Sequence, residues 1–400
     1  MTEPDRGGPA QQKERSMSDS RSAPLDGVKV LEIGGMGPGP YAGMTLAGMG
    51  ADVIRIERPG GLGVFPGEPT RDLLNRGKRS VCLDLTHDSA VEAVLKMVER
   101  ADILIEGHRP GVAERLGIGP QQCQQRNPAL VYGRMTGWGQ DGPLARVAGH
   151  DIGYIALTGA LHAIGDAGGP PQIPVNLVGD FGGGGAYLVM GVLAALWDAA
   201  RTGRGRVVDA AIVDGAAHLL TGTHAMLNAG AWRDERGVNM LDGGAPYYAI
   251  YRTGDDRHMA VGAIEAKFYA LLLSGLGLTD VAVGQQNDRA TWPATRARIA
   301  AAFATRTQRE WTEIFGTSDA CVSPVLSMQE AKDHPHIAAR GTLTAGNGVL
   351  QAAPAPRFDG LTVPPQSSPP QPGQHTAAVL SEWGIDPAPL LADGAASAAQ

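Results

Sequence analysis

The stretch that decides the fold lies near the start of the chain. Val28-Lys29-Val30-Leu31-Glu32-Ile33 reads as a β-strand, and Gly34–Gly39 reads as a turn. Pro40 suits the first position of a helix, which Tyr41–Gly48 continues. A second strand follows at Ala51–Ile56. A unit of about 30 residues with this order joins parallel strands, so the sequence predicts an α/β fold built on a parallel sheet.

The turn also matches the dinucleotide-binding pattern G-x-G-x-x-A. The match runs through Gly37-Pro38-Gly39-Pro40-Tyr41-Ala42, and the acidic Glu57 follows it. We discount dinucleotide binding, because Pro38 and Pro40 remove two backbone N–H donors from the loop that would hold a pyrophosphate. The unit is therefore interpreted as Rossmann-like in topology only.

The pattern changes near residue 230. Before it, strands and helices alternate, with strands predicted at Val81–Leu85, Ile103–Glu106, Leu130–Gly133 and Arg206–Ile212 and a buried helix at Leu188–Ala200. After it, a hairpin at Tyr247–Tyr251 and His258–Val261 is followed mainly by helices. A chain of 400 residues also exceeds one ordinary core. We predict a disordered extension at 1–23, a large Rossmann-like α/β domain at 24–229, a smaller α+β domain at 230–340, a Pro-rich return and helix that rejoin the large domain at 341–385, and a flexible tail at 386–400.

Composition and charge narrow the function classes. Hydrophobic residues make up 43% of the chain, and the net charge of −7 argues against a nucleic-acid binder. Cys82, Cys123 and Cys321 form no disulfide framework, and an odd number of cysteines fits a reducing cytoplasm. The N-terminal residues lack the apolar segment of a signal peptide, and no apolar run reaches the roughly 18 residues that span a membrane. The sequence thus predicts a cytoplasmic protein that does not enter a membrane.

Cations gather at the end of the second strand and after it. The group comprises Arg55, Arg58, Arg71, Arg76, Lys78 and Arg79. Single residues of this kind are usually solvated surface charges, but six of them in a net-negative chain favour a phosphate-binding site. Gly107-His108-Arg109-Pro110-Gly111 follows another strand end, where α/β folds bind ligands. His334 and His336 lack a third ligand, so no metal site is predicted.

The segment Ala148–Phe181 carries the candidate catalytic residues. His150 and Asp180 each lie among glycines, and Gly182–Gly185 lead into the apolar helix. A glycine-rich turn before a helix leaves N–H groups that can hold developing negative charge, and a histidine with a carboxylate can move protons. The helix terminus would favour the ionised carboxylate, so burial or a nearby charge must oppose it. The alternatives are structural, with His150 as a loop residue and Asp180 as a helix N-cap.

A series of different short motifs lies along the chain, and both the motifs and their order are informative. It comprises Pro24-Leu25-Asp26-Gly27, Gly50-Ala51-Asp52-Val53-Ile54-Arg55-Ile56-Glu57, Glu106-Gly107-His108-Arg109-Pro110-Gly111, Thr136-Gly137-Trp138-Gly139-Gln140, Ala148-Gly149-His150-Asp151-Ile152, Gly179-Asp180-Phe181-Gly182-Gly183, Thr202-Gly203-Arg204-Gly205, Asn239-Met240-Leu241-Asp242-Gly243-Gly244-Ala245-Pro246-Tyr247-Tyr248, Ala263-Ile264-Glu265 and Ser318-Asp319-Ala320-Cys321-Val322. By these motifs the chain resembles the family III CoA-transferase superfamily, and within it the racemases. The match runs from about Pro24 to Trp383.

The resemblance implies both an architecture and a site. It implies an interlocked homodimer of two-domain subunits, with each active site between the large domain of one subunit and the small domain of the other. It implies that His150 and Asp180 are the acid/base groups, and that Glu265 reaches the histidine from the other subunit. It implies CoA contacts from Arg58, Leu83, Asp84, Leu85, Thr86, Gly107, His108, Arg109, Arg115, Gly149, Asp151, Ile152, Gly153 and Tyr154. His108 stands where related sequences carry a tyrosine, which is expected to alter adenine-side contacts but not the chemistry.

The activity that the resemblance implies is inversion of the α-carbon of 2-methyl-branched acyl-CoA thioesters by 1,1-proton transfer through an enolate. An imidazole, which titrates near pH 6.5, suits either proton removal or delivery, and a paired carboxylate would orient it. No cofactor is needed, because CoA enters as part of the thioester substrate. One alternative is a CoA-transferase in which Asp180 is the nucleophile and forms a mixed anhydride and then a thioester. A non-catalytic CoA-binding scaffold is the other. His150 together with Glu265 favours the racemase, since a transferase has no evident need for this pair.

Overall fold

The predicted βαβ unit forms at the start of the large domain. In the computed structural model, which describes residues 22–60, 67–346, 348–359 and 367–399, β1 (Lys29–Ile33) leads through α1 (Pro38–Gly48) to β2 (Asp52–Glu57). The two strands pair in parallel, and Glu32 lies opposite Arg55. The helix begins two residues before the predicted start, because Pro38 rather than Pro40 takes its first position. The α/β class is confirmed.

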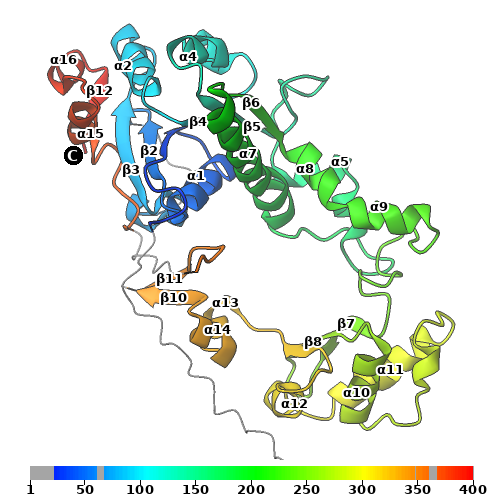
Figure 1. Ribbon diagram of the computed structural model, residues 1–400. Coiled ribbons are helices and arrows are strands. Elements are labelled where there is room, and N and C mark those ends of the chain that lie inside the picture. The colour runs from blue at the N-terminus through cyan, green and yellow to red at the C-terminus, as the bar shows by residue number, and fades with distance from the viewer. Residues whose placement is uncertain (1–21, 61–66, 347, 360–366, 400) are drawn as a thin grey trace, which may run out of the picture.

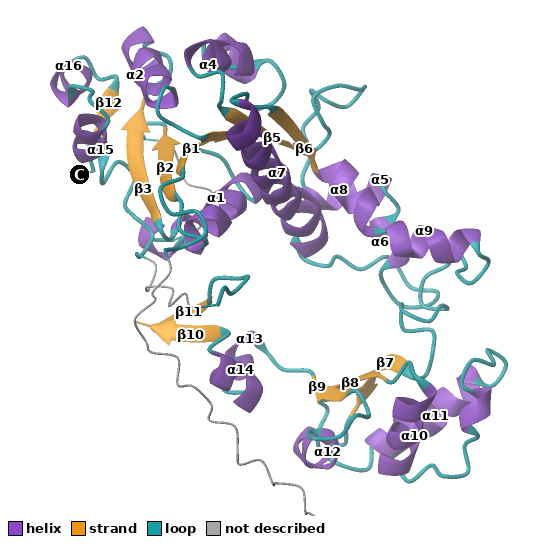
Figure 2. Ribbon diagram, in the orientation of Figure 1, coloured by secondary structure: helices purple, strands orange, loops and turns teal. Residues whose placement is uncertain are grey.

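A seven-stranded sheet runs through the large domain (Figures 1 and 2), in the order β12-β3-β2-β1-β4-β5-β6. All neighbouring strands pair in parallel except β12 and β3. The further strands are β3 (Lys78–Leu83), β4 (Ile103–Glu106), β5 (Val131–Thr136), β6 (Val207–Ala211) and β12 (Ala396–Ser397). The chain order reverses between β1 and β4. In α/β proteins, ligands bind outside the carboxyl ends of the strands at such a switch point.

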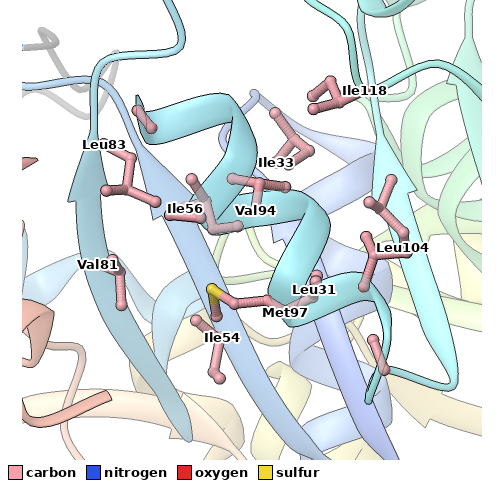
Figure 3. Packing of buried hydrophobic residues seen from close by; sticks show 14 of the residues in the cluster. Leu31, Ile33, Ile54, Ile56, Val81, Leu83, Val94, Met97, Leu104 and Ile118 are labelled. Atoms are coloured by element: carbon pink, nitrogen blue, oxygen red, sulfur yellow. The ribbon is translucent and has the colours of Figure 1, made fainter. Parts of the chain in front are cut away.

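Helices cover both faces of this sheet. On one face, α2 (Asp88–Val98) packs Val94 and Met97 over the aliphatic side chains of β1, β2 and β3 (Figure 3). On the other face, α1 and α7 (Tyr187–Thr202) bury Leu46, Leu188 and Val192. The other helices of this domain are η1 (Pro69–Arg71), η2 (Leu73–Asn75), α3 (Val112–Arg115), α4 (Pro120–Arg126), α5 (Asp151–Leu157), α6 (Ala160–Ala163), η3 (Leu177–Ala186), α8 (Ile212–Leu219) and α9 (Thr221–Asn228). The predicted helix at 213–229 is therefore two helices.

The small domain has its own sheet and core. The predicted hairpin forms β7 (Tyr248–Arg252) and β8 (His258–Gly262), and β9 (Val322–Pro324) adds a third antiparallel strand. The helices are α10 (Ala266–Gly275), η4 (Val283–Gln285), α11 (Trp292–Phe303) and α12 (Gln308–Phe315). Aromatic residues fill the core, where Phe303 lies between Tyr251 and Trp311. This cluster is separate from those of the large domain.

Two connections join the small domain to the large one (Figure 1). One runs from α9 to β7, and the other returns through α13 (Met328–Ala331), α14 (Pro335–Arg340) and the β10–β11 hairpin (Leu343–Gly346, Val349–Ala352). The return reaches α15 (Thr376–Glu382), which packs Val379 and Leu380 into the core of the large domain. Residues 360–366 of the predicted Pro-rich return, and residues 1–21 of the predicted extension, lie outside the described residues.

The prediction of a flexible tail at 386–400 is wrong for the described residues. This segment forms α16 (Pro387–Ala392) and then β12, which pairs antiparallel with β3. Ala395 and Ala396 are buried against the large-domain core. The physical reason is that β12 supplies backbone partners to the outer edge of β3, which would otherwise be unpaired.

One continuous helical element differs from the expectation that no segment could span a membrane. In the described part of the chain, Leu177–Thr202 has 26 residues and contains an 18-residue window with a mean hydropathy of 1.4, which suffices by length and composition. It is long because η3 runs directly into α7. Its inner residues Leu188, Val192 and Ala195 are buried. A buried core helix can also have this length and hydropathy. The length and hydropathy of this element are therefore only weak evidence for a membrane span.

Candidate active site

The candidate active site is a cavity at the switch point of the large sheet. It has a volume of about 450 Å³ and lies at the carboxyl ends of β1, β4 and β5. It is lined by Ile33, Gly35, Met36, Gly37, Pro38, Gly39, Pro40, Ile105, Gly107, His108, Arg109, Pro110, Met135, Thr136, Gly137, Trp138, Ala145, Val147, Ala148, Gly149, His150, Tyr154, Asp180 and Ile212. The two predicted acid/base residues, which are distant in sequence, therefore share one cavity.

His150 is positioned by the loop that precedes α5. It is the N-cap residue of that helix, and its carbonyl accepts hydrogen bonds from the N–H groups of Gly153 and Tyr154. The Tyr154 ring packs against Gly137 and Gly149, where an added Cβ would collide with the ring. The rings of Trp138 and Tyr154 pack edge to face, with their centroids 4.7 Å apart. A glycine precedes the histidine because the aromatic pair occupies the space that a side chain at position 149 would need.

Asp180 lies in the first turn of η3, a π-helical segment. Its N–H donates to Oδ1 of Asp151 at 2.6 Å, and its Oδ2 accepts from Nδ2 of Asn176 at 3.3 Å. The same Oδ2 faces Gly37, where an added Cβ would be 3.2 Å away. Three segments thus surround this carboxylate. The N–H of Asp180 is not free to hold an enolate oxygen, because Asp151 already accepts it; the predicted role of the other N–H groups in this segment stays a prediction.

The run Gly182–Gly185 is not the turn that the sequence predicts. It belongs to η3, and its backbone contacts neighbouring elements directly. An added Cβ at Gly183 would be 2.6 Å from the N of Ala216 in α8, and one at Gly185 would be 2.9 Å from the O of Pro38 in α1. The glycines therefore let the segment that carries Asp180 pack between α1 and α8.

The surroundings of Asp180 favour its protonated form. Burial raises the pKa of this carboxyl, and the nearby charge of Asp151 raises it further, whereas the hydrogen bond from Asn176 and the charge of His150 oppose the shift. Burial also raises the pKa of Tyr154, with a smaller contribution from Asp180. A carboxyl whose pKa moves toward neutrality is better suited to exchange protons with a carbon acid.

Some of the predicted CoA-binding residues line the cavity and others do not. Gly107, His108, Arg109, Gly149 and Tyr154 line it together with the acid/base pair. The N–H of His108 donates to Oε2 of Glu106 at 2.6 Å, which fixes the loop after β4. Burial lowers the pKa of His108, so its neutral imidazole is favoured.

The other predicted CoA contacts lie around the cavity. Arg58 follows β2, and Leu83, Asp84, Leu85 and Thr86 end or follow β3, so they share the carboxyl edge of the sheet but not the cavity. Arg115 is exposed at the end of α3. Asp151 is buried behind Asp180, and Ile152 and Gly153 lie on α5 outside the lining.

The predicted phosphate cluster is wrong for four of its six cations. Arg55 and Lys78 are buried and pair with Glu32. Arg79 pairs with Asp52 and Glu382, and Arg76 donates to the carbonyl of Ala352 at 2.7 Å. Arg58 and Arg71 are exposed. Acids that are distant in sequence pair with Arg55, Lys78 and Arg79, and a local count of charges cannot detect them.

Glu265 lies in the small domain, as the exposed N-cap residue of α10. It is close enough to Cys321 to raise the pKa of that thiol, second to the effect of burial. It does not line the cavity that holds His150. Its predicted role concerns the other subunit of a dimer and stays a prediction.

Sequence reasoning missed three residues that shape the site. Gly37 and Asn176 both contact the Asp180 carboxylate, and Trp138 braces Tyr154. Asn176 precedes Asp180 by four positions, a spacing that brings side chains together on a helix. It would have been found if the helix had been predicted to begin at Leu177.

A parallel sheet with this strand order and an acid/base pair at its switch point defines an α/β enzyme class, and comparison with known proteins gives the family. The family model "CoA-transferase family III" matches residues 25–376, and the chain belongs to this family. The chain is 44% identical over 369 residues to alpha-methylacyl-CoA racemase from Mus musculus, with 92% of this chain and 95% of that protein covered. It is 42% identical over 363 residues to the Homo sapiens protein of the same name, with 90% and 94% covered.

The fold is also found among solved structures. A CAIB/BAIF family protein from Brucella suis superimposes with a TM-score of 0.76 at 26% sequence identity, covering 91% of this chain and all of that chain. The resemblance stated from the motifs is thereby confirmed at the level of the family and of the large parallel-sheet domain.

Proposed function

We propose that the chain is a racemase that inverts the α-carbon of 2-methyl-branched acyl-CoA thioesters. The observation that carries the proposal is that His150 and Asp180 line one cavity, in a chain that closely matches two proteins named alpha-methylacyl-CoA racemase. One of the two groups removes the α-proton, which leaves an enolate. The other delivers a proton to the opposite face of the same carbon, so the two together invert it without any net gain or loss of atoms.

The CoA part of the substrate is proposed to follow the carboxyl edge of the sheet. Arg58, Arg109 and Arg115 are exposed at or near the ends of β2, β4 and α3, where guanidinium groups can bind phosphates. Gly107, which lines the cavity, allows the thioester to approach the backbone. CoA is substrate here, and the reaction needs no further group for proton transfer. A cytoplasmic location stays a prediction.

Proton NMR of an enantiopure 2-methylacyl-CoA in D2O tests the activity. The α-proton signal is expected to disappear while the other epimer appears. His150→Ala and Asp180→Ala should each abolish the appearance of the other epimer while the circular dichroism spectrum is unchanged, although the remaining base can still exchange the α-proton of one enantiomer. Full racemisation by either folded variant would contradict the two-base assignment.

A CoA-transferase is the second candidate, supported by the family that the chain belongs to. In that reaction the carboxylate of Asp180 would attack the thioester and later carry CoA in a covalent thioester. Intact-mass measurement after incubation with acyl-CoA distinguishes the two. An adduct lost in Asp180→Ala, with CoA passing to an added carboxylic acid and no α-proton exchange, would move the assignment to the transferase.

The proposal includes a homodimer in which Glu265 of one subunit orients His150 of the other. Co-expression of His150→Ala and Glu265→Ala chains provides a test. A mixed dimer with shared sites holds one site with both changes and one with neither, so activity should return in part from two weak variants. If the mixed dimers are no more active than the two single variants, the shared site is contradicted.

A further inference from the structure

A cluster of buried charges lies beneath the wall of the candidate active site. Glu32, Arg55 and Lys78 come from β1, β2 and β3, and they lie on the sheet face that α1 covers. The Lys78 side chain is fully buried, and that of Glu32 is 1% exposed. Nζ of Lys78 is 2.6 Å from Oε2 of Glu32, and Nη1 of Arg55 is 2.5 Å from Oε1. One carboxylate therefore uses both oxygens to hold two cations inside the domain.

Each cation also donates to the backbone of the segment that leads from β1 into the first turn of α1. Nη2 of Arg55 donates to the carbonyl of Gly35 at 3.2 Å, and Nζ of Lys78 donates to the carbonyl of Pro40 at 2.9 Å. The segment between these two carbonyls forms one wall of the cavity. Gly37 lies in its middle with φ of +63°, against Oδ2 of Asp180.

The packing above the cluster leaves no room for adjustment. Gly43 of α1 lies over it, and an added Cβ there would collide with Oε2 of Glu32 and lie 3.2 Å from Nζ of Lys78. Burial lowers the pKa of Lys78 to about 8, and the charge of Glu32 counteracts this shift. The ammonium group therefore depends on Glu32 to stay charged.

We infer that Lys78 and Arg55 are positioning residues of the active site, which fix the segment from Gly35 to Pro40 at its two ends and thereby hold Gly37 against the Asp180 carboxylate. Such a buried ion cluster contributes little net stability to the fold, because the cost of removing three charges from water is about as large as the gain from their attraction. Its two bonds to loop carbonyls give it a role that an apolar core would not fill.

The inference rests on the proposed racemase activity and is tested with Lys78→Met and Arg55→Lys. Arg55→Lys keeps the charge but loses the fork that reaches Glu32 and Gly35 at once. Arg79→Met is the matched control, since Arg79 neighbours Lys78 on β3 but pairs with Asp52 and Glu382. The measurements are kcat and KM of α-proton exchange across pH, together with the melting temperature.

Both cluster variants should lower kcat about ten- to hundredfold, as a misplaced reacting group does, with KM little changed. The acid limb of the pH profile should move, because the surroundings of Asp180 change. Arg79→Met should melt earlier without these effects. Folded cluster variants with the wild-type kcat and pH profile would overturn the inference. If Lys78→Met does not fold, the kcat and pH profile of Arg55→Lys alone test the inference. Wild-type enzyme without exchange would instead overturn the proposed function.

Discussion

At the scale of single residues, the Asp180 carboxylate depends on a glycine that lies far away in the sequence. Gly37 has φ of +63°, and an added Cβ would lie 3.2 Å from Oδ2 of Asp180. Gly37→Ala should therefore lower kcat about tenfold or more, since it moves a reacting group. Gly27→Ala is the control, because Gly27 also has positive φ, at +83°, but nothing lies near its added Cβ. Exchange kinetics in which both variants lose the same activity would contradict this contact.

The pKa of Asp180 gives a second prediction at this scale. Each direction of racemisation needs one proton between the two groups, so the acid limb of a bell-shaped profile follows the lower pKa. Asp151→Asn keeps an oxygen for the Asp180 N–H but removes a negative charge that raises the pKa of Asp180. The acid limb of kcat should therefore move to lower pH. Kinetics from pH 4 to pH 9 in which the acid limb stays in place or moves to higher pH would contradict this assignment.

The sequence identified His150 and Asp180 because each stands in a glycine-rich motif, but it could not identify their supports. Gly37, which contacts the carboxylate, follows another strand, and Arg55, which donates to the nearby Gly35, lies on a third; the sheet and its parallel pairing bring these segments together. The cations after β2 were misread for the same reason. Glu32, the partner of Arg55 and Lys78, lies on β1, before the helix α1 that separates it from both cations in sequence.

At the scale of elements, the glycine run of η3 determines how closely three helices approach. An added Cβ at Gly215 of α8 would collide with the carbonyl of Gly183, and one at Gly183 would collide with α8 in return. Gly183→Ala should lower the free energy of unfolding by about 1–3 kcal/mol, because backbone atoms cannot move aside as side chains do. Urea denaturation measures this change.

A matched helix position provides the control. Gly222 lies in α9, and nothing lies within 4 Å of its added Cβ. Gly222→Ala should be neutral or stabilise the chain by up to about 1 kcal/mol, because Gly222 is the second residue of α9 and alanine favours a helix more than glycine does. Equal losses in the two variants would show that packing against α8 is not the cause.

Local patterns predicted the longer elements well and the shorter ones poorly. The central strands and the small-domain hairpin form near their predicted positions, because their apolar periodicity is strong. The three residues of β9 and the two of β12 are too few to show a period. The π-helical segment was predicted as a turn, because glycine runs usually break helices and the surrounding α1 and α8 are not visible in a local window.

At the scale of the whole molecule, the segment that returns to the large domain is held there by a pH-dependent hydrogen bond between His375 and Ser80, which we call the clasp. Nδ1 of His375 accepts the N–H of Ser80 at 3.1 Å, and burial followed by the charge of Arg79 lowers the pKa of His375. The folded state thus binds this proton less readily than the unfolded state. The clasp is complete above about pH 6.5 and is lost as the pH falls through the lower folded value.

Hydrogen exchange of residues 373–399 at pH 7.5 and pH 5.5 tests the clasp. Exchange should accelerate at the lower pH after correction for intrinsic rates. His375→Asn can offer an uncharged oxygen near the position of Nδ1, so its exchange should change less between the two pH values. Equal acceleration in both proteins would assign the effect to other groups.

The position of β12 has a consequence for how this protein is made. The edge of β3 receives its partners from the far end of the chain, and Cys82 and Thr376, which are hydrogen-bonded, are 294 positions apart. At about 5–20 residues per second, a ribosome needs roughly 15–60 s to synthesise the intervening chain. During that interval a nascent β3 offers an open edge to other nascent chains, so chaperones that bind extended segments should be most needed then.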